Sequence, residues 1–414
     1  MKLLVSHPTG NTFVRALLEY ANKKDMLARF HTTIAYRGGN WMSRLMPKGV
    51  RSQYERRAYP IPDEIIHRHP FRETIRLVAA KVGLANLTDH ENGWASLDEV
   101  YRELDRKTAQ SLASPDITHV HCYEDGALDT FRQAGLLGIR RSYELPIAHW
   151  KKMRELLALE AERLPQWTPT LIATEDSAEK LDRKDEELAL ADSIAVPSQF
   201  VLDSLPESIR AQKTCIIAPF GTPTGSEDKH RAPRDLPEKI RFLFAGAMGQ
   251  RKGLGDVLKA FSKIHRNDIE LIVLGNPMMK MEFYRQEYAD FIYEAPRPHS
   301  EVLKLMRTCH VLVLPSIVEG RALVQQEAMS QGMALLVTRN AGGEDLVVEG
   351  ETGVLVAPGN PDALMEQIHC FADQPGKTMK MGGEAKKHAS GYTWAAYAKA
   401  LLCGLADKST HLDS

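Results

Sequence analysis

Two glutamates lie in a loop and a helix in the second half of the 414-residue chain. Residues 311–338 read VLVLPSIVEGRALVQQEAMSQGMALLVT, which predicts a buried strand up to Pro315, a loop with Glu319 and a helix with Glu327. Glu327 follows more than one turn into that helix, so its carboxylate is placed to accept hydrogen bonds from vicinal ribose hydroxyls. Glu319, in the loop, is placed to bind the hydroxyls of a sugar.

The start of the same helix is the predicted place for a diphosphate. The first N–H groups of a helix have no partner inside it, and the helix dipole makes that end attractive to anions. We therefore expect donor-site contacts from Gly320, Arg321, Ala322 and Leu323, with the glycine letting a ligand approach the backbone closely.

A second segment adds two cations. Residues 242–258 read FLFAGAMGQRKGLGDVL, which predicts a strand ending at Ala245, a turn with Gly246, and a helix preceded by Arg251 and Lys252. Cations beside a glycine-rich turn suit a pyrophosphate. When a glycosyl–diphosphate bond breaks, negative charge builds up on the leaving group, and fixed cations stabilise it more in the transition state than in the ground state. The two segments together predict a site for a diphosphate, with carboxylates placed for the hydroxyls of a ribose and of a sugar.

The elements that must position these residues alternate in type, which predicts parallel sheets built of βαβ units. The predicted strands are Lys2–Ser6, His119–Cys122, Ser193–Val196, Cys215–Ala218, Ile240–Ala245, Ile269–Leu274, Val311–Pro315 and Ala334–Thr338. The predicted helices are Asn11–Lys23, Leu254–Ile264, His299–Arg307, Ala322–Gln331, a long run from Asp362 to His388, and Trp394–Leu405.

The stretch from Pro219 to Pro237 interrupts this alternation with prolines, glycines and charges, which is typical of a linker. The sequence therefore predicts an α/β protein with a first domain over residues 1–218, a linker over 219–239 and a donor-binding domain over 240–393. Two doubly wound, Rossmann-like domains in this order would face a cleft at the carboxyl ends of their strands.

The composition limits the classes of protein to which the chain can belong. A formal net charge of −1 gives no sign of nucleic-acid binding. The five cysteines form no Cys-x-x-Cys pair, and we expect reduced thiols in a cytoplasmic protein. The apolar run at the N-terminus is too short for a signal peptide, and no stretch is long enough for a transmembrane helix.

The region from Arg37 to Lys81 carries ten Lys and Arg side chains against four Asp and Glu, with Trp41, Tyr54 and Phe71 among them. One interpretation is a basic, aromatic-bearing surface that contacts an anionic membrane peripherally, at its inner face. The other is a solvated insertion, which is what charge runs usually are.

At the two motif segments the sequence resembles glycosyltransferase family 4, a family of retaining enzymes with the GT-B fold. The family's Glu-x7-Glu motif is matched by EGRALVQQE at Glu319 and Glu327, and its lysine–glycine signature by Lys252 and Gly253. The later segment NAGGEDLVVEGETGVLVAPGN matches its glycine-rich turn, acidic helix and strand. The resemblance spans about Phe242–Pro361 and extends more weakly into the first domain.

The resemblance implies further site residues. His121 matches the second histidine of a His-x-His pattern near the reacting sugar, and Gly10 lies in a loop that faces the diphosphate in family members. The alternative for His121 is a structural histidine at a strand end, and the alternative for Gly10 is a tight turn. The resemblance also implies that the last helix, in 394–414, crosses back to the first domain, and that the acceptor hydroxyl attacks from the face of the leaving phosphate.

Two positions depart from the family. Ala247 stands where an arginine is common, so Arg251 is expected to supply that charge, and Arg321 stands where an aromatic is common. No Asp-x-Asp occurs, so we expect no cofactor and no metal ion. The acceptor stays open among saccharides, lipid-linked and small molecules.

Two alternatives remain. A non-catalytic nucleotide-sugar binding protein would need the same donor site without turnover. A dinucleotide-dependent oxidoreductase is disfavoured, because the G-x-G after the cations lacks its third glycine and a placed acidic residue.

Overall fold

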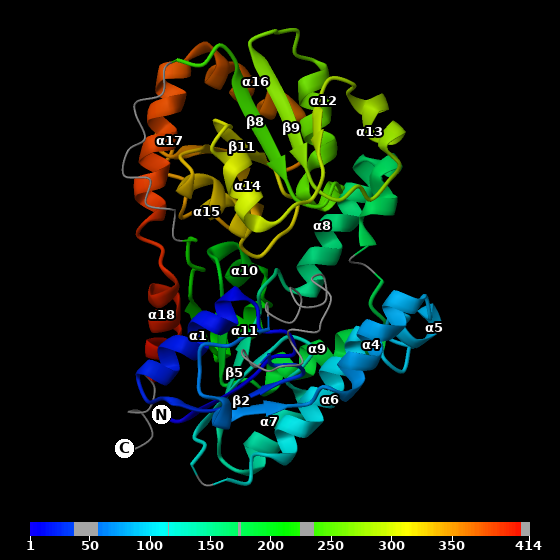
Figure 1. Cartoon of the computed structure of the whole chain (residues 1–414), viewed down its shortest axis with the longest axis vertical. Coiled ribbons are helices and arrows are strands. Elements are labelled where there is room, and N and C mark those ends of the chain that lie inside the picture. Colours follow the sequence, from blue (N-terminus) through cyan, green and yellow to red (C-terminus); the bar gives the residue numbers. More distant parts are fainter. Residues whose placement is uncertain (37–56, 115, 173–174, 224–235, 407–414) are drawn as a thin grey trace, which may run out of the picture.

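The structure is a computed structural model that describes residues 1–36, 57–114, 116–172, 175–223 and 236–406. Figure 1 shows two lobes stacked along the long axis, each built around one sheet, with the first half of the chain below and most of the second half above. The predicted basic region thus lies outside the described residues between positions 37 and 56.

The lower lobe contains a seven-stranded sheet in the order β3-β2-β1-β4-β5-β6-β7. Every neighbouring pair is parallel. Its interior strand β1 is buried at all four positions, as expected for a parallel strand covered on both faces. The strands are β1 (Leu3–Ser6), β2 (Leu27–Thr32), β3 (Ile66–Arg68), β4 (His119–Tyr123), β5 (Arg140–Glu144), β6 (Ser193–Val196) and β7 (Thr214–Ile217).

Helices connect these strands and cover the sheet (Figure 1). They are α1 (Thr12–Lys23), α4 (Phe71–Val82), α5 (Ala85–Thr88), α6 (Leu97–Gln110), α7 (Leu128–Leu136), α8 (Trp150–Arg163), α9 (Ala178–Leu190), α10 (Gln199–Ser204) and α11 (Glu207–Gln212). Two short 3-10 helices, η1 (Asp63–Ile65) and η2 (Pro165–Thr170), complete the described part of this half of the chain.

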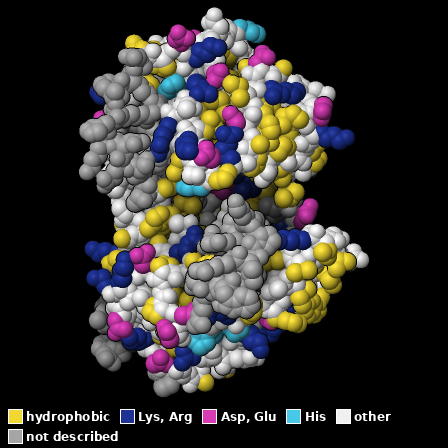
Figure 2. Space-filling view, in the orientation of Figure 1, with side chains coloured by type: hydrophobic (Ala, Val, Ile, Leu, Met, Phe, Trp, Pro, Cys, Tyr) yellow, Lys and Arg dark blue, Asp and Glu magenta, His cyan; other side chains and the backbone are white. Residues whose placement is uncertain are grey.

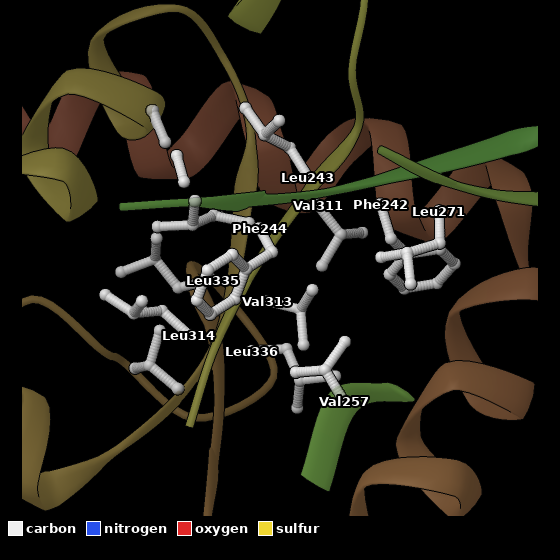
Figure 3. Packing of buried hydrophobic residues seen from close by; sticks show 14 of the residues in the cluster. Phe242, Leu243, Phe244, Val257, Leu271, Val311, Val313, Leu314, Leu335 and Leu336 are labelled. Carbon is white, nitrogen blue, oxygen red and sulfur yellow. The ribbon is translucent and has the colours of Figure 1, made fainter. Parts of the chain in front are cut away.

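The upper lobe contains a second parallel sheet in the order β10-β9-β8-β11-β12-β13. Its strands are β8 (Ile240–Ala245), β9 (Ile269–Leu274), β10 (Ile292–Glu294), β11 (Val311–Leu314), β12 (Ala334–Thr338) and β13 (Gly353–Val356). Its core interleaves Phe242, Phe244 and Leu271 with the strand side chains of β11 and β12 (Figure 3).

The helices of this lobe are α12 (Leu254–Ser262), α13 (Met281–Glu287), α14 (His299–Met306), α15 (Leu323–Ser330), α16 (Pro361–Asp373) and α17 (Pro375–Ala389), with the short 3-10 helices η4 (Gln250–Lys252) and η5 (Arg339–Ala341). The run predicted as one helix from Asp362 to His388 is therefore two helices. Pro375 causes the break, because proline lacks an N–H and disfavours helical backbone at the preceding Gln374.

Two segments cross between the lobes (Figure 1). The last helix, α18 (Trp394–Ala406), packs on α1 and β7, and its Tyr397, Leu401 and Leu402 join the buried cluster of the first sheet. In the other direction, Leu164 and Trp167 belong to the core of the second sheet. A first domain drawn as residues 1–218 therefore includes an α8–η2 segment that packs into the second lobe.

None of the helices in the described ranges has the length and apolar character needed to cross a bilayer.

Candidate active site

A cavity of about 360 Å³ lies in the second lobe at the carboxyl ends of β8 and β9. The start of α15 forms another wall, so the cavity sits where open parallel sheets bind their ligands. Its lining residues are Ala245, Gly246, Ala247, Lys252, Leu274, Gly275, Asn276, Pro296, Arg297, Val302, Ala322, Leu323, Val324 and Glu327. The structure thus brings together five residues that the sequence selected, namely Gly246, Lys252, Ala322, Leu323 and Glu327.

The first turn of α15 faces this cavity through Ala322, Leu323 and Val324. No side chain caps the helix at Ala322, whose own N–H donates to the carbonyl of Ala341 at 3.1 Å. The positive end of the helix dipole is therefore presented to the cavity by the residues after Ala322, which suits an anion.

Lys252 forms an ion pair with Glu319 beside the cavity. The Lys252 Nζ lies 2.5 Å from Glu319 Oε1, and the same oxygen lies 3.0 Å from an Arg251 guanidinium nitrogen. Lys252 packs along Gly246, where a Cβ would lie 2.6 Å from Lys252 Cδ, and Gly246 has φ +148°. A side chain at position 246 would displace the lysine, so the glycine is needed for the lysine's position.

The charges of Glu319, Lys252 and Arg251 stabilise one another. Burial alone would raise the pKa of Glu319, but attraction to Lys252 and Arg251 outweighs it and holds that pKa below its ordinary value. The Glu319 side chain is 11% exposed and that of Lys252 15%. Two cations thus share one carboxylate in a largely desolvated place, and an anionic ligand would compete with Glu319 for both of them.

Glu327 reaches the cavity from the middle of α15. Its Oε1 lies 3.0 Å from His299 Nε2 at the start of α14, and its side chain is 19% exposed. From Leu323 to Glu327 the helix rises by about 6 Å. A ligand with an anionic group at the helix start and hydroxyls one turn further in matches this spacing.

A second, smaller cavity of about 100 Å³ shares Ala247 and Lys252 with the first. Its other lining residues are Thr170, Ile172, Gly249, Arg251 and Met278. Lys252 therefore lies between two spaces, and the segment after η2 contributes to one of them. Sequence reasoning missed Thr170 and Ile172, because nothing in their local pattern marks them.

A buried polar network holds the turn that carries the two cations. Gln250 is fully buried; its backbone N–H donates to the Thr170 hydroxyl at 2.9 Å, and its side-chain amide donates to Glu160 at 2.5 Å and Asp256 at 2.9 Å. Arg163 pairs with Glu160 and Asp256 in turn. The α8–η2 segment therefore anchors η4, which no sequence pattern indicated.

Arg321 lies elsewhere than expected. Its buried guanidinium donates to Asp345 at 2.6 Å and to Gln326 at 3.0 Å, and it lies 5.1 Å from the Tyr392 ring. It does not line the cavity around Glu327. Asp345 and Gln326 therefore hold this buried charge away from the cavity at which donor contacts of Arg321 were expected.

His121 is likewise enclosed. Its ring is fully buried on β4, with Nδ1 3.0 Å from Ser142 Oγ and Nε2 2.9 Å from Glu144 Oε2. Tyr397 of α18 donates to the same carboxylate. Both ring nitrogens are engaged, as the structural alternative for His121 predicts, and its place near a reacting sugar stays a prediction.

The glycines at 10 and 320 are explained by packing of the chain on itself. Gly10, with φ +60°, lies where a Cβ would meet the ring of Tyr59 at 2.1 Å. A Cβ on Gly320 would lie 1.7 Å from the carbonyl oxygen of Pro146, and the Gly320 carbonyl accepts from Ser198 at 2.8 Å. Gly320 thus lets the two lobes touch, and neither glycine lines the cavity around Glu327.

The first lobe offers a carboxyl group with altered acidity. Burial raises the pKa of Glu124, directly after β4, to about 7, although Lys184 lies 3.7 Å away. This is not the environment of a solvated turn carboxylate, and Glu124 keeps the chemical capacity of a proton acceptor near neutral pH.

The family described as glycosyl transferases group 1 matches residues 226–388. The chain is also similar to the D-inositol 3-phosphate glycosyltransferase of Corynebacterium glutamicum, at 26% identity over 51% of this chain and 56% of the relative. The corresponding protein of Corynebacterium efficiens is 26% identical over 70% of this chain and 77% of the relative.

Solved structures resemble the whole chain. Sucrose-phosphate synthase from Thermosynechococcus elongatus superposes with a TM-score of 0.66 at 16% identity, covering 97% of this chain and 98% of that one. The Anabaena protein Alr3699/HepE in complex with UDP gives a TM-score of 0.62 at 13% identity, covering 98% of this chain and all of that one.

The expected fold is confirmed: two parallel-sheet, Rossmann-like domains arranged as in GT-B glycosyltransferases. The family match over residues 226–388 includes both motif segments, the one with Arg251 and Lys252 and the one with Glu319 and Glu327.

Proposed function

We propose that this protein is a retaining, family 4 glycosyltransferase that moves a hexosyl group from a nucleoside-diphosphate sugar to an acceptor hydroxyl. The observation that carries the proposal is the convergence of Lys252, Glu327 and the start of α15 on one cavity of about 360 Å³, with Arg251 and Glu319 beside it.

The donor is assigned to this cavity by charge and spacing. The diphosphate lies over the first turn of α15, within reach of Lys252, and the ribose lies toward Glu327. The sugar then extends toward Glu319. When the diphosphate engages Lys252 and Arg251, the Glu319 carboxylate is released to accept hydrogen bonds from sugar hydroxyls.

In the transfer step, the bond between the sugar's anomeric carbon and the phosphate oxygen breaks, and a bond forms from that carbon to the acceptor oxygen on the same face. The acceptor proton passes to the leaving phosphate oxygen. Lys252 and Arg251 stabilise the negative charge that grows on the diphosphate in the transition state. The proposed reaction therefore needs no metal ion for this stabilisation.

Two measurements test the proposal. A thermal-shift screen of UDP, GDP and ADP should identify one ligand that raises the melting temperature, since a ligand at a hundred times its Kd stabilises a protein by about 2.7 kcal/mol. Release of that nucleoside diphosphate from its sugar conjugate should then be catalysed by the wild type and be slower by about 10² to 10³ in Lys252→Ala. Binding without any turnover, across acceptors, would identify a non-catalytic binding protein instead.

A further inference from the structure

The α8–η2 segment joins the two lobes beside the candidate site. In Figure 1, α8 runs from the first lobe into the second, and Figure 2 shows the surface hollowed between the lobes in this region. Glu160 on α8 and Thr170 at the end of η2 are both buried, and both contact Gln250, the first residue of η4. Gln250 immediately precedes the two cations of the site, so its contacts bear on where they lie.

The side-chain amide of Gln250 has a hydrogen bond at each of its polar atoms. The nitrogen donates to Glu160 and to Asp256, and the oxygen accepts from the Gly255 N–H at 2.7 Å. The backbone N–H of Gln250 donates to the Thr170 hydroxyl. A fully buried amide that is bonded in this way has one orientation, because a rotated amide would face the carboxylates with its oxygen.

The charges around the amide explain why a glutamine suits this position. Arg163 pairs with Glu160 and with Asp256, so two buried carboxylates share one guanidinium. The two N–H groups of the Gln250 amide are the donors that these carboxylates receive from η4. A carboxylate at position 250 would add a third negative charge, and an apolar side chain would leave the two acids without these donors. The network therefore depends on an amide.

The η4 turn also holds the loop that leads to Glu319. The backbone carbonyl of Arg251 accepts from the Ile317 N–H at 2.9 Å, and the Arg251 guanidinium donates to the Val318 carbonyl at 3.2 Å. Glu319, whose carboxylate pairs with both Arg251 and Lys252, is the next residue. A shift of η4 would therefore move the two cations and the Glu319 loop together.

We propose that Gln250 is a positioning residue for the transfer reaction: held by Thr170 and Glu160, it fixes Arg251 and Lys252 where the donor phosphates need them. Gln250 lines neither of the two cavities beside Lys252, so it acts through its neighbours in the chain and not on the donor. A misplacement of about 1 Å in a catalytic group can cost about 10²-fold in rate. The inference rests on the proposed function, since it assigns this network to the reaction proposed there.

Steady-state kinetics of the full chain test the inference. Gln250→Met keeps the length of the side chain but loses the hydrogen bonds of the amide, and it should lower kcat by about tenfold to a hundredfold with little change in the donor KM. Thr170→Val removes one hydroxyl and should lower kcat by a smaller factor. In the Lys252→Ala background the loss from Gln250→Met should shrink, because the charge that Gln250 positions is gone, whereas independent effects would multiply.

Thr378→Val is the matched control. Thr170 and Thr378 are both 2% exposed, and each hydroxyl donates to a backbone carbonyl at 2.8 Å. Thr378 lies in α17 and lines neither cavity beside Lys252, so its substitution should lower the melting temperature and leave kcat unchanged. If Gln250→Met does not fold, Thr170→Val takes its place in the cycle with Lys252→Ala.

Three results would overturn the inference: an unchanged kcat in the folded variants at positions 170 and 250, losses that multiply in the Lys252→Ala background, or an equal loss of kcat in Thr378→Val. The absence of turnover in the folded wild type would instead overturn the proposed function, and no variant is needed to see it.

Discussion

Replacing Lys252 with alanine should reduce turnover far more than donor affinity. The Lys252 side chain is 15% exposed and sits between the two cavities, so solvent screens its charge little. A unit charge about 4 Å away at an effective dielectric constant of about 20 is worth roughly 4 kcal/mol. The ground-state diphosphate is already charged, so only part of this acts on the barrier. We expect kcat to fall by about 10² to 10³, the range for one preorganised electrostatic partner.

The assay is steady-state release of the nucleoside diphosphate at several donor concentrations. Lys259→Ala removes an exposed lysine from α12 of the same lobe and should leave both kinetic constants near wild type. Lys252→Arg keeps the charge and should recover part of kcat. An increase in KM with an unchanged kcat would show that Lys252 only binds the donor, and the role assigned to it at the leaving group would be refuted.

Three further predictions concern stability. Burial and the neighbouring His67 lower the pKa of His31 to about 3, so the unfolded state takes up a proton below about pH 6.5 while the folded state does not. The stability that neutral His31 contributes to the folded state is therefore present above pH 6.5 and is lost as the pH falls toward 3. The urea midpoints of wild type and His31→Gln should converge between pH 7 and pH 5. Gly320→Ala places a Cβ against Pro146 and should lower the melting temperature by several degrees, more than the substitution of an exposed residue does. Gly383→Ala, in α17 with open space around its Cβ position, should stabilise by about 0.5–1 kcal/mol in urea unfolding. Equal effects of the two glycine substitutions would contradict the packing argument.

Much of the second lobe was predictable because its strands are continuous apolar runs. Ile240–Ala245 and Ile269–Leu274 were predicted with the bounds that the structure has, since buried parallel strands are marked by composition alone. The short strands β2, β3 and β10 were missed: Arg29 and His31 dilute the pattern in β2, and three residues are too few to show one in β3 and β10.

The residues of the candidate site also differ in how far the sequence predicts them, since some are marked by local motifs and others depend on long-range contacts. Lys252, Glu327 and the start of α15 were found because their local motifs already place them on one loop and one helix turn. The contacts of His121 and Arg321 could not be predicted, because their partners Ser142, Glu144 and Asp345 are far from them in sequence. The anchoring of Gln250 by the α8–η2 segment depends on the same kind of long-range contact.

The most direct test of the proposed donor placement is a double-mutant cycle at Glu327. Isothermal titration would measure the nucleoside diphosphate from the thermal screen, and its 2′-deoxy form, against wild type and Glu327→Gln. If Glu327 accepts from the ribose, the substitution should cost about 1.5–3 kcal/mol with the ribonucleotide and little with the deoxynucleotide, because that hydroxyl is already gone. Equal losses with both ligands, giving no coupling, would mean that the ribose does not lie against α15 and that the donor binds elsewhere.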